Sequence, residues 1–313
     1  MLGKTAGGLF WMSRYLERAE NTARLLETGQ RMALTRTKNS AEEWGSVLKT
    51  AGVLDGYLAK YDEVDRDNAV DWLLRDVDNP SSVKSVIKQA RHNARLVRTA
   101  LTYDVWGAVN ATWMKIDEAT QRRVNQRDLP AVLELVRQQA ALVRGATLGT
   151  MLRNDIFDFM RIGTFVERAD STGRILDVKY YVLLPTAFAV GSSLDNIQWE
   201  SILRSVGAGG GYQLTYGQRT TPSDIAQFLI LDQRMPRSLH FCCRKIQENL
   251  SYLKKDYGFA GPSCEASNTL YDKYLNRRIA DIFDFGLHEY IQDFLNDLGG
   301  LSRQIEVDYR FYE

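Results

Sequence analysis

The most constraining feature of this sequence is an internal repeat with a spacing of about 150 residues. Residues 15–27 and 165–177 align at an offset of 150. The identical pairs in this segment are Glu17/Glu167, Arg18/Arg168, Ala19/Ala169, Thr22/Thr172, Arg24/Arg174 and Leu26/Leu176. The offset grows to 155 and then to 156 farther along the chain, where Trp44 aligns with Trp199 and Ser82 with Ser238. Since the same order of elements occurs twice, the sequence predicts a tandem duplication.

The spacing of the apolar residues predicts an all-α fold. Leu and Ala recur at i, i+3 and i+4 between Arg and Glu, only 6 prolines interrupt 313 residues, and no convincing alternation indicates a strand. The predicted helices span residues 8–37, 40–50, 67–77, 80–101, 103–122, 129–150, 154–184, 195–206, 222–231, 235–253, 267–276 and 279–308. Prolines and capping hydroxyls mark helix starts at 80–82, 221–224 and Pro236.

The repeat also predicts the domain organisation. We expect two repeats, residues 1–151 and 152–313, to form one compact helical bundle. Two copies of one fold usually pack about a pseudo-two-fold axis, as the subunits of a dimer do. Small loop insertions explain the change in offset, and the largest falls around residues 184–196.

The charge balance and the cysteine count limit the class of protein. Forty Lys and Arg residues against 39 Asp and Glu residues give a net charge of +1, which favours neither nucleic acid nor a membrane surface as a partner. No apolar run reaches the roughly 18 residues that a spanning helix needs, and the start lacks a signal-peptide pattern. The odd set Cys242, Cys243 and Cys264 fits a reducing compartment. We therefore expect a cytoplasmic protein.

The repeated segment reads as an amphipathic helix with an acid and a base side by side. On a helical wheel its apolar face carries small Ala19 and Ala23, which favour close helix packing, and Arg18 lies to one flank. The polar face of the first copy carries Glu17, Glu20, Asn21 and Arg24, and that of the second copy carries Glu167, Asp170, Ser171 and Arg174. If the two helices face each other, four acids and four arginines meet near the axis.

Three interpretations of these charges stay open at this point. They cover a solvated helix face, they form a buried charge network that fixes the register of the two copies, or they line a pocket that holds a charged ligand. The candidate residues for the network or the ligand site are Glu17, Arg18, Glu20, Arg24, Glu167, Arg168, Asp170 and Arg174.

The sequence indicates neither a metal site nor a catalytic group. Helical di-iron sites add Glu-x-x-His motifs, and no histidine here has that spacing. The "GKT" at 3–5 lacks the preceding glycine and strand of a phosphate loop, and the Gly-rich segment 207–212 reads as a flexible connection between helices. We predict no metal, no cofactor and no nameable catalytic residue.

A second set of arginines is a candidate for partner docking. Arg91, Arg95 and Arg98 are spaced at i, i+4 and i+7 along a predicted helix. A solvated basic stripe is the simpler interpretation, and a docking surface for an acidic partner or ligand is the alternative. Trp44 and Trp199, at matching positions in the two copies, read as core anchors.

Four segments of the chain together resemble the bacterial alpha-E family, an all-helical domain named for its ER motif. They are "RYLERAENTARLL", "ARHNARLVR", "FVERADSTGRILDVKYYVLLP" and "QWESILRS". By this resemblance Glu17, Arg18, Glu167 and Arg168 occupy the naming motif. The resemblance implies a cytoplasmic protein that accompanies a circularly permuted ATP-grasp ligase and often a transglutaminase-like protease.

The resemblance sets the expected function. We expect an accessory or co-catalytic partner of the ATP-grasp ligase in ATP-dependent amide-bond formation on a peptide or an amino-acid metabolite. The alternatives are a stand-alone enzyme, a transferase or ligase component with its active site between the ER helices, and a purely structural adaptor.

Overall fold

The computed structural model is a bundle of helices arranged around two long central ones, α1 (Gly3–Thr35) and α8 (Asp155–Val182). It describes residues 1–35, 40–182, 193–217 and 220–313, and in these ranges all regular structure is helical. The all-α prediction is therefore confirmed for the described chain. The predicted insertion around 184–196 falls largely outside the described residues.

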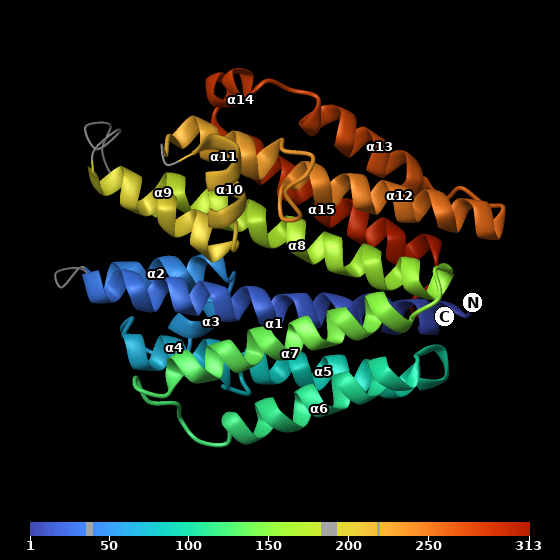
Figure 1. Cartoon of the computed structure of the whole chain (residues 1–313), viewed down its shortest axis with the longest axis horizontal. Coiled ribbons are helices and arrows are strands. Elements are labelled where there is room, and N and C mark those ends of the chain that lie inside the picture. The colour runs from blue at the N-terminus through green and yellow to red at the C-terminus, as the bar shows by residue number, and fades with distance from the viewer. Residues whose placement is uncertain (36–39, 183–192, 218–219) are drawn as a thin grey trace.

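The first half of the chain packs mainly along α1, and the second half packs mainly along α8 (Figure 1). The other helices of the first half are α2 (Ser40–Thr50), α3 (Leu54–Leu58), α4 (Arg66–Leu74), α5 (Val83–Leu96), α6 (Tyr103–Ala119) and α7 (Leu129–Thr150). Those of the second half are α9 (Ser193–Ser205), α10 (Gly209–Tyr216), α11 (Pro222–Ile230), α12 (Leu239–Tyr257), α13 (Pro262–Leu275), α14 (Ile279–Phe285) and α15 (Leu287–Asp308). The predicted division after residue 151 lies in the connection between α7 and α8.

Hydroxyl caps start the helices where the sequence indicates them. Ser82 accepts a hydrogen bond from the Ser85 amide at the start of α5, and its repeat equivalent Ser238 accepts one from Phe241 at the start of α12. Thr221 caps α11 directly before Pro222. Each cap satisfies an amide that the first helical turn leaves without a partner.

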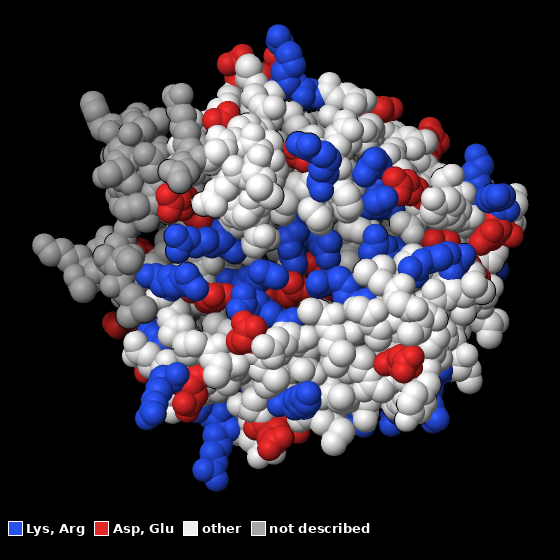
Figure 2. All heavy atoms as spheres, in the orientation of Figure 1, with Lys and Arg blue, Asp and Glu red and all other residues white. Residues whose placement is uncertain are grey.

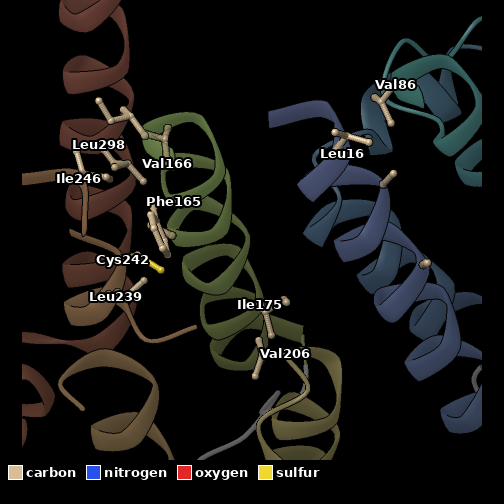
Figure 3. Close-up of a cluster of buried hydrophobic side chains, with 14 of the residues drawn as sticks. Leu16, Val86, Phe165, Val166, Ile175, Val206, Leu239, Cys242, Ile246 and Leu298 are labelled. Carbon is tan, nitrogen blue, oxygen red and sulfur yellow. The ribbon is translucent and has the colours of Figure 1, made fainter. Parts of the chain in front are cut away.

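The central helices α1 and α8 bury their apolar faces against different neighbouring helices. Leu16 of α1 lies toward Val86 of α5 (Figure 3). Phe165 and Val166 of α8 point toward a cluster that includes Ile246 of α12 (Figure 3). Gly173 permits α8 to pack closely on α15, since a Cβ at this position would lie 2.8 Å from a methyl carbon of Leu295. The polar faces of α1 and α8 are thereby left to meet each other.

Several predicted elements differ from the structure. α13 begins five residues earlier than predicted, and α3 has no counterpart among the predicted helices. The helix expected over 279–308 is two helices, because Gly286 adopts φ = 108° between α14 and α15. The Gly-rich segment expected to be a flexible connection contains α10, in which buried Tyr212 stacks on Tyr216 at 5.0 Å. The helix expected over 80–101 ends at Leu96 and is followed by a 3-10 turn, Arg98–Ala100.

α1 and α8 approach each other closely at Gly163, and we expect this position to tolerate no side chain. A Cβ there would lie 2.3 Å from the Phe10 carbonyl oxygen, which belongs to backbone and cannot move aside cheaply. Gly163→Ala should lower the free energy of unfolding by about 1–3 kcal/mol. Gly145→Ala on α7, where a Cβ meets nothing within 4 Å, should raise it by about 0.5–1 kcal/mol. Urea denaturation measures both, and equal effects would contradict the close approach.

Candidate functional site

The two ER motifs meet between α1 and α8 and pair reciprocally. Arg18 on α1 donates from Nε to Glu167 Oε1 at 2.5 Å and from Nη2 to Oε2 at 2.9 Å. Arg168 on α8 donates from Nε to Glu17 Oε1 at 2.8 Å and from Nη2 to Oε2 at 2.9 Å. Each arginine therefore holds the glutamate of the other helix in a two-pronged contact, which is the strongest geometry for this pair. We call the eight charged residues predicted above the ER seam.

Burial and charge act in opposite directions on the seam glutamates. Glu17 and Glu167 are each 4% exposed. Burial alone would raise the pKa of Glu17, but the charges of Arg168 and Arg237 lower it well below its usual value. Glu167 is also buried, yet Arg18 and Arg14 lower its pKa to about 2. Both carboxylates are therefore ionised in the folded protein near neutral pH.

The Glu17 side of the seam contains arginines from α1 itself, from α7 and from the loop before α12. Glu20, only 2% exposed, accepts from Arg24 at 2.8 Å and from Arg237 at 3.0 Å, and it also accepts from Arg144 on α7. Arg237, in the loop before α12, approaches Glu17 at 3.1 Å as well. Burial and the neighbouring Glu17 raise the pKa of Glu20, but Arg237 and Arg144 lower it overall. This side holds more guanidiniums than carboxylates.

The Glu167 side is less crowded and contains a cavity of about 190 Å³, which we call the seam cavity. Arg14 donates to Glu167 at 2.9 Å, and Arg174 donates to Asp170 at 2.7 Å. The Asp170 and Arg174 side chains are 26% and 44% exposed, so they border solvent. The cavity is lined by Arg18, Asn21, Thr22, Leu25, Thr50, Ala51, Gly52, Ser81, Glu167, Asp170, Ser171, Arg174 and Ile175. Its wall thus presents carboxylates, guanidiniums and hydroxyls together.

The structure brings together all eight predicted seam residues and adds three arginines that the sequence did not indicate. The idea of a solvated face is wrong for Glu17, Glu20, Glu167 and Arg168, because all four are buried. The additional arginines are Arg14, Arg144 and Arg237. Arg14 could have been found, since it precedes Arg18 by four residues on the same helix. Arg144 and Arg237 come from segments that are distant in the sequence, so no local sequence pattern indicates that they join the seam.

The predicted docking arginines do not form one helical stripe. Arg91 donates from Nε to Asn110 on α6 at 2.8 Å, so it joins two helices. Arg95 is exposed, and Arg98 lies in the 3-10 turn beyond α5, 5.8 Å above the Trp106 ring. The stripe is interrupted because the α-helix ends at Leu96.

Two tryptophans, a cysteine and a histidine outside the ER seam are buried. Trp44 and Trp199 are buried core residues, as expected. Cys242 is buried beside Arg168, and burial raises the pKa of its thiol to about 12, so it stays protonated at neutral pH. His240 is buried against the Tyr271 hydroxyl at 2.9 Å. Among the described residues no cluster of three or more His, Cys, Asp or Glu side chains could hold a metal ion.

An all-helical protein whose two ER motifs pair across a central helix pair is the class that this fold and site define. The chain belongs to the Alpha-E family, described as a predicted alpha-helical domain with a conserved ER motif, and the family model matches residues 1–309. In the described part of the chain, no helix is both long enough and apolar enough to cross a membrane.

The curated relatives are longer proteins. An uncharacterized protein of Mycobacterium bovis and one of Mycobacterium tuberculosis are each 24% identical to this chain over 276 residues. The match covers 81% of this chain but only 30% of each relative. The chain therefore spans less than a third of their length. No solved structure gives a significant match.

The buried pairs should contribute far more stability than the exposed pair of the same seam. Arg168→Met leaves Glu17 buried without its two-pronged partner and should lower the free energy of unfolding by about 3–5 kcal/mol. Arg174→Met removes a partly exposed i, i+4 pair and should cost less than about 1 kcal/mol. Urea denaturation at neutral pH measures both variants. Equal costs would show that the buried pair contributes no more than the exposed one.

The lowered glutamate pKa values predict a loss of stability in acid. A folded pKa near 2 for Glu167, below its unfolded value of about 4.3, gives stability that is fully present above pH 5 and is lost as pH falls toward 2. Glu17 and Glu20 shift in the same direction and add to this slope. Glu167→Gln should be less stable at pH 7 but should show a shallower decline between pH 5 and 2. Parallel declines in chemical denaturation would contradict the assignment.

Proposed function

We propose that this chain is an accessory or co-catalytic partner of a circularly permuted ATP-grasp ligase that forms amide bonds on a peptide or an amino acid. The seam cavity then holds the amino-acid-like substrate. The observation that carries this proposal is the cavity's lining, in which Arg18 and Arg174 can face a carboxylate while Asp170 can face an amine. A volume of about 190 Å³ far exceeds that of single trapped waters and suits a ligand of amino-acid size.

The length of the relatives supports a partnership. In both mycobacterial proteins most of the chain lies outside the matched segment, so there the alpha-E unit is joined to further polypeptide. A unit that occurs fused in one protein is a natural candidate for a non-covalent partner in another. A transglutaminase-like protease belongs to the same proposal as a second partner, and exposed Arg95 and Arg98 are candidates for docking.

We also infer that the two halves are repeats related by a pseudo-two-fold axis. The reciprocal pairs support this, since Arg18 contacts Glu167 as Arg168 contacts Glu17. A second reciprocal contact involves the glycines aligned at an offset of 155. A Cβ at Gly52 would lie 3.1 Å from Arg174 Nη1, and one at Gly207 would lie 2.7 Å from Arg24 Nη1.

The difference between the two halves supports the choice of the seam cavity as the substrate site. In the alignment at an offset of 156, Ser81 corresponds to Arg237. Arg237 occupies the Glu17 side and contacts Glu17, Glu20 and Asn21. Ser81 on the Glu167 side is small and lines the cavity instead. The Arg237 side chain therefore fills the Glu17 side, whereas the Glu167 side keeps room for a ligand.

The structural adaptor is the second candidate, and the full pairing of Glu17 and Glu167 favours it. Carboxylates that already accept two-pronged contacts from arginine have little capacity left for substrate. A stand-alone enzyme, a transferase or ligase component, would use the same cavity as its active site. The adaptor would need the seam only for stability and assembly.

The test fills the cavity without touching the ion pairs. Ser171, partly buried in the cavity wall, is replaced by Trp, and exposed Ser251 on α12 is replaced by Trp as the matched control. Each protein is mixed with a circularly permuted ATP-grasp ligase from the same organism, and ATP consumption is measured with the candidate amino acids. The wild type and Ser251→Trp should stimulate ATP consumption, and Ser171→Trp should lose most of the stimulation while circular dichroism stays helical.

The outcomes separate the candidates. If no complex forms and ATP consumption does not change, the partnership is wrong. If Ser171→Trp stimulates as well as the wild type, the cavity holds no substrate and the adaptor is favoured. If the chain alone turns over substrate without the ATP-grasp protein, it is an enzyme in its own right.

A further inference from the structure

A second cavity lies between α1, α7 and α8, and it shares no lining residue with the seam cavity. Its volume of about 50 Å³ is room for a few water molecules or one small ion. Its polar lining comes from Ser13 and Glu17 on α1, Arg144 and Thr147 on α7, and Arg161 and Thr164 on α8. The rest is apolar and comes from Leu16, Ala140, Val143, Leu148 and Met160. We call it the arginine cavity.

Arg161 has no carboxylate partner and no hydrogen-bond acceptor among the residues that the structure describes. Its guanidinium lies over two aromatic rings, 4.3 Å from the centroid of Phe165 and 5.8 Å from that of Phe157. Burial and the nearby charges of Arg168 and Arg153 lower the pKa of Arg161 to about 10, although the guanidinium stays charged at neutral pH. A half-buried cation without an anion is costly, so an anion beside it would stabilise the protein.

The surrounding network cannot supply that anion, because it already holds surplus positive charge. The carboxylates of Glu17 and Glu20 are shared among the guanidiniums of Arg24, Arg144, Arg168 and Arg237. Glu248 acts on Arg161 from a distance, but its own carboxylate pairs with Lys245 at 2.5 Å. On the face drawn in Figure 2, Lys and Arg side chains gather along the middle, with Asp and Glu between them. The local excess is of positive charge, in contrast to the chain's nearly neutral total.

The hydroxyl of a buried serine completes the polar lining of the arginine cavity. Ser13 is 6% exposed, and in the described part of the chain its hydroxyl has no hydrogen-bond partner. The hydroxyls of Thr147 and Thr164 donate to the carbonyls of Val143 and Met160 within their own helices. Ser13 is therefore the one lining hydroxyl of the three that is free to donate to a bound molecule.

We infer that the arginine cavity binds a small divalent oxyanion, either inorganic phosphate or the phosphoryl group of a larger molecule. Arg144 and Arg161 supply two guanidiniums, which suit phosphate oxygens, and the Ser13 hydroxyl donates from the third side. Glu17 also lines the cavity, but Arg168 and Arg237 hold its carboxylate oxygens. A divalent anion offsets the surplus charge better than a monovalent carboxylate does. This site goes beyond the proposed function and does not depend on it.

The test measures oxyanion binding to the isolated chain. Inorganic phosphate, phosphoserine and acetate are titrated by calorimetry at constant ionic strength. We expect saturable binding of phosphate or phosphoserine and much weaker binding of acetate. Arg161→Met, which keeps the apolar contact with Phe165, should weaken phosphate binding at least tenfold, whereas Arg303→Met, at an exposed position of α15 outside the cavity, should leave it unchanged. Tighter binding of phosphoserine than of phosphate identifies a phosphoryl group as the occupant, and the reverse order identifies the free ion.

The melting temperature shows whether weaker binding by the variant comes from misfolding. Without phosphate, Arg161→Met should melt at or above the wild-type temperature, because it removes an uncompensated charge, and phosphate should raise only the wild-type melting temperature. Ser13→Ala gives a second variant if Arg161→Met does not fold, and it should weaken binding several-fold. Absence of saturable binding by either phosphate compound overturns the inference. Phosphate binding at wild-type strength in Arg161→Met also overturns the inference. If Arg161→Met does not fold, phosphate binding at wild-type strength in Ser13→Ala overturns it.

Discussion

The reciprocal contact between the two ER motifs is the interaction on which this bundle depends. Glu17 and Glu167 are removed from water, and this costs free energy that only a complete set of partners offsets. Arg18 and Arg168 satisfy the condition only when α1 and α8 lie at one register, because each guanidinium must reach a carboxylate on the other helix. A slip by one residue would leave buried charges unpaired. The contact therefore selects one arrangement of the central helices, and the apolar faces that pack outward onto α5, α12 and α15 follow from it.

The same contact explains why the site is charged on both sides, although the two sides differ in the space that they leave open. Arg237 and Arg144 crowd the Glu17 side, whereas Ser81 leaves the Glu167 side open as the seam cavity. Ser81 and Arg237 align at an offset of 156, and under the proposed duplication the difference between these two side chains helps to close one side and keep the other open. The excess of guanidinium over carboxylate that results is a local property. A net charge of +1 over 313 residues gives no sign of it.

Local signals in the sequence predicted the helices well where caps and prolines act on their own neighbours. Ser82 and Thr221 start helices in the structure because a side-chain oxygen three residues before an amide can cap it in any context. The errors occurred where distant contacts outweigh local preference. Glycines 209–211 are helical because α10 buries Tyr212 against Phe228, and α14 ends where Gly286 turns the chain. Arg98 left the predicted stripe because α5 ends before it.

The sequence by itself determined that the chain is helical and that an ER helix occurs twice, and it named eight charged residues as candidates for one network or ligand site. These conclusions needed only periodicity and repetition, which are properties of neighbouring and aligned residues. Only the tertiary structure decided which acid meets which arginine, that Asp170 and Arg174 border solvent while Glu17 and Glu167 do not, and that Arg14, Arg144 and Arg237 join the seam. Burial and pairing depend on helices that lie far apart in the chain, so no local pattern carries that information.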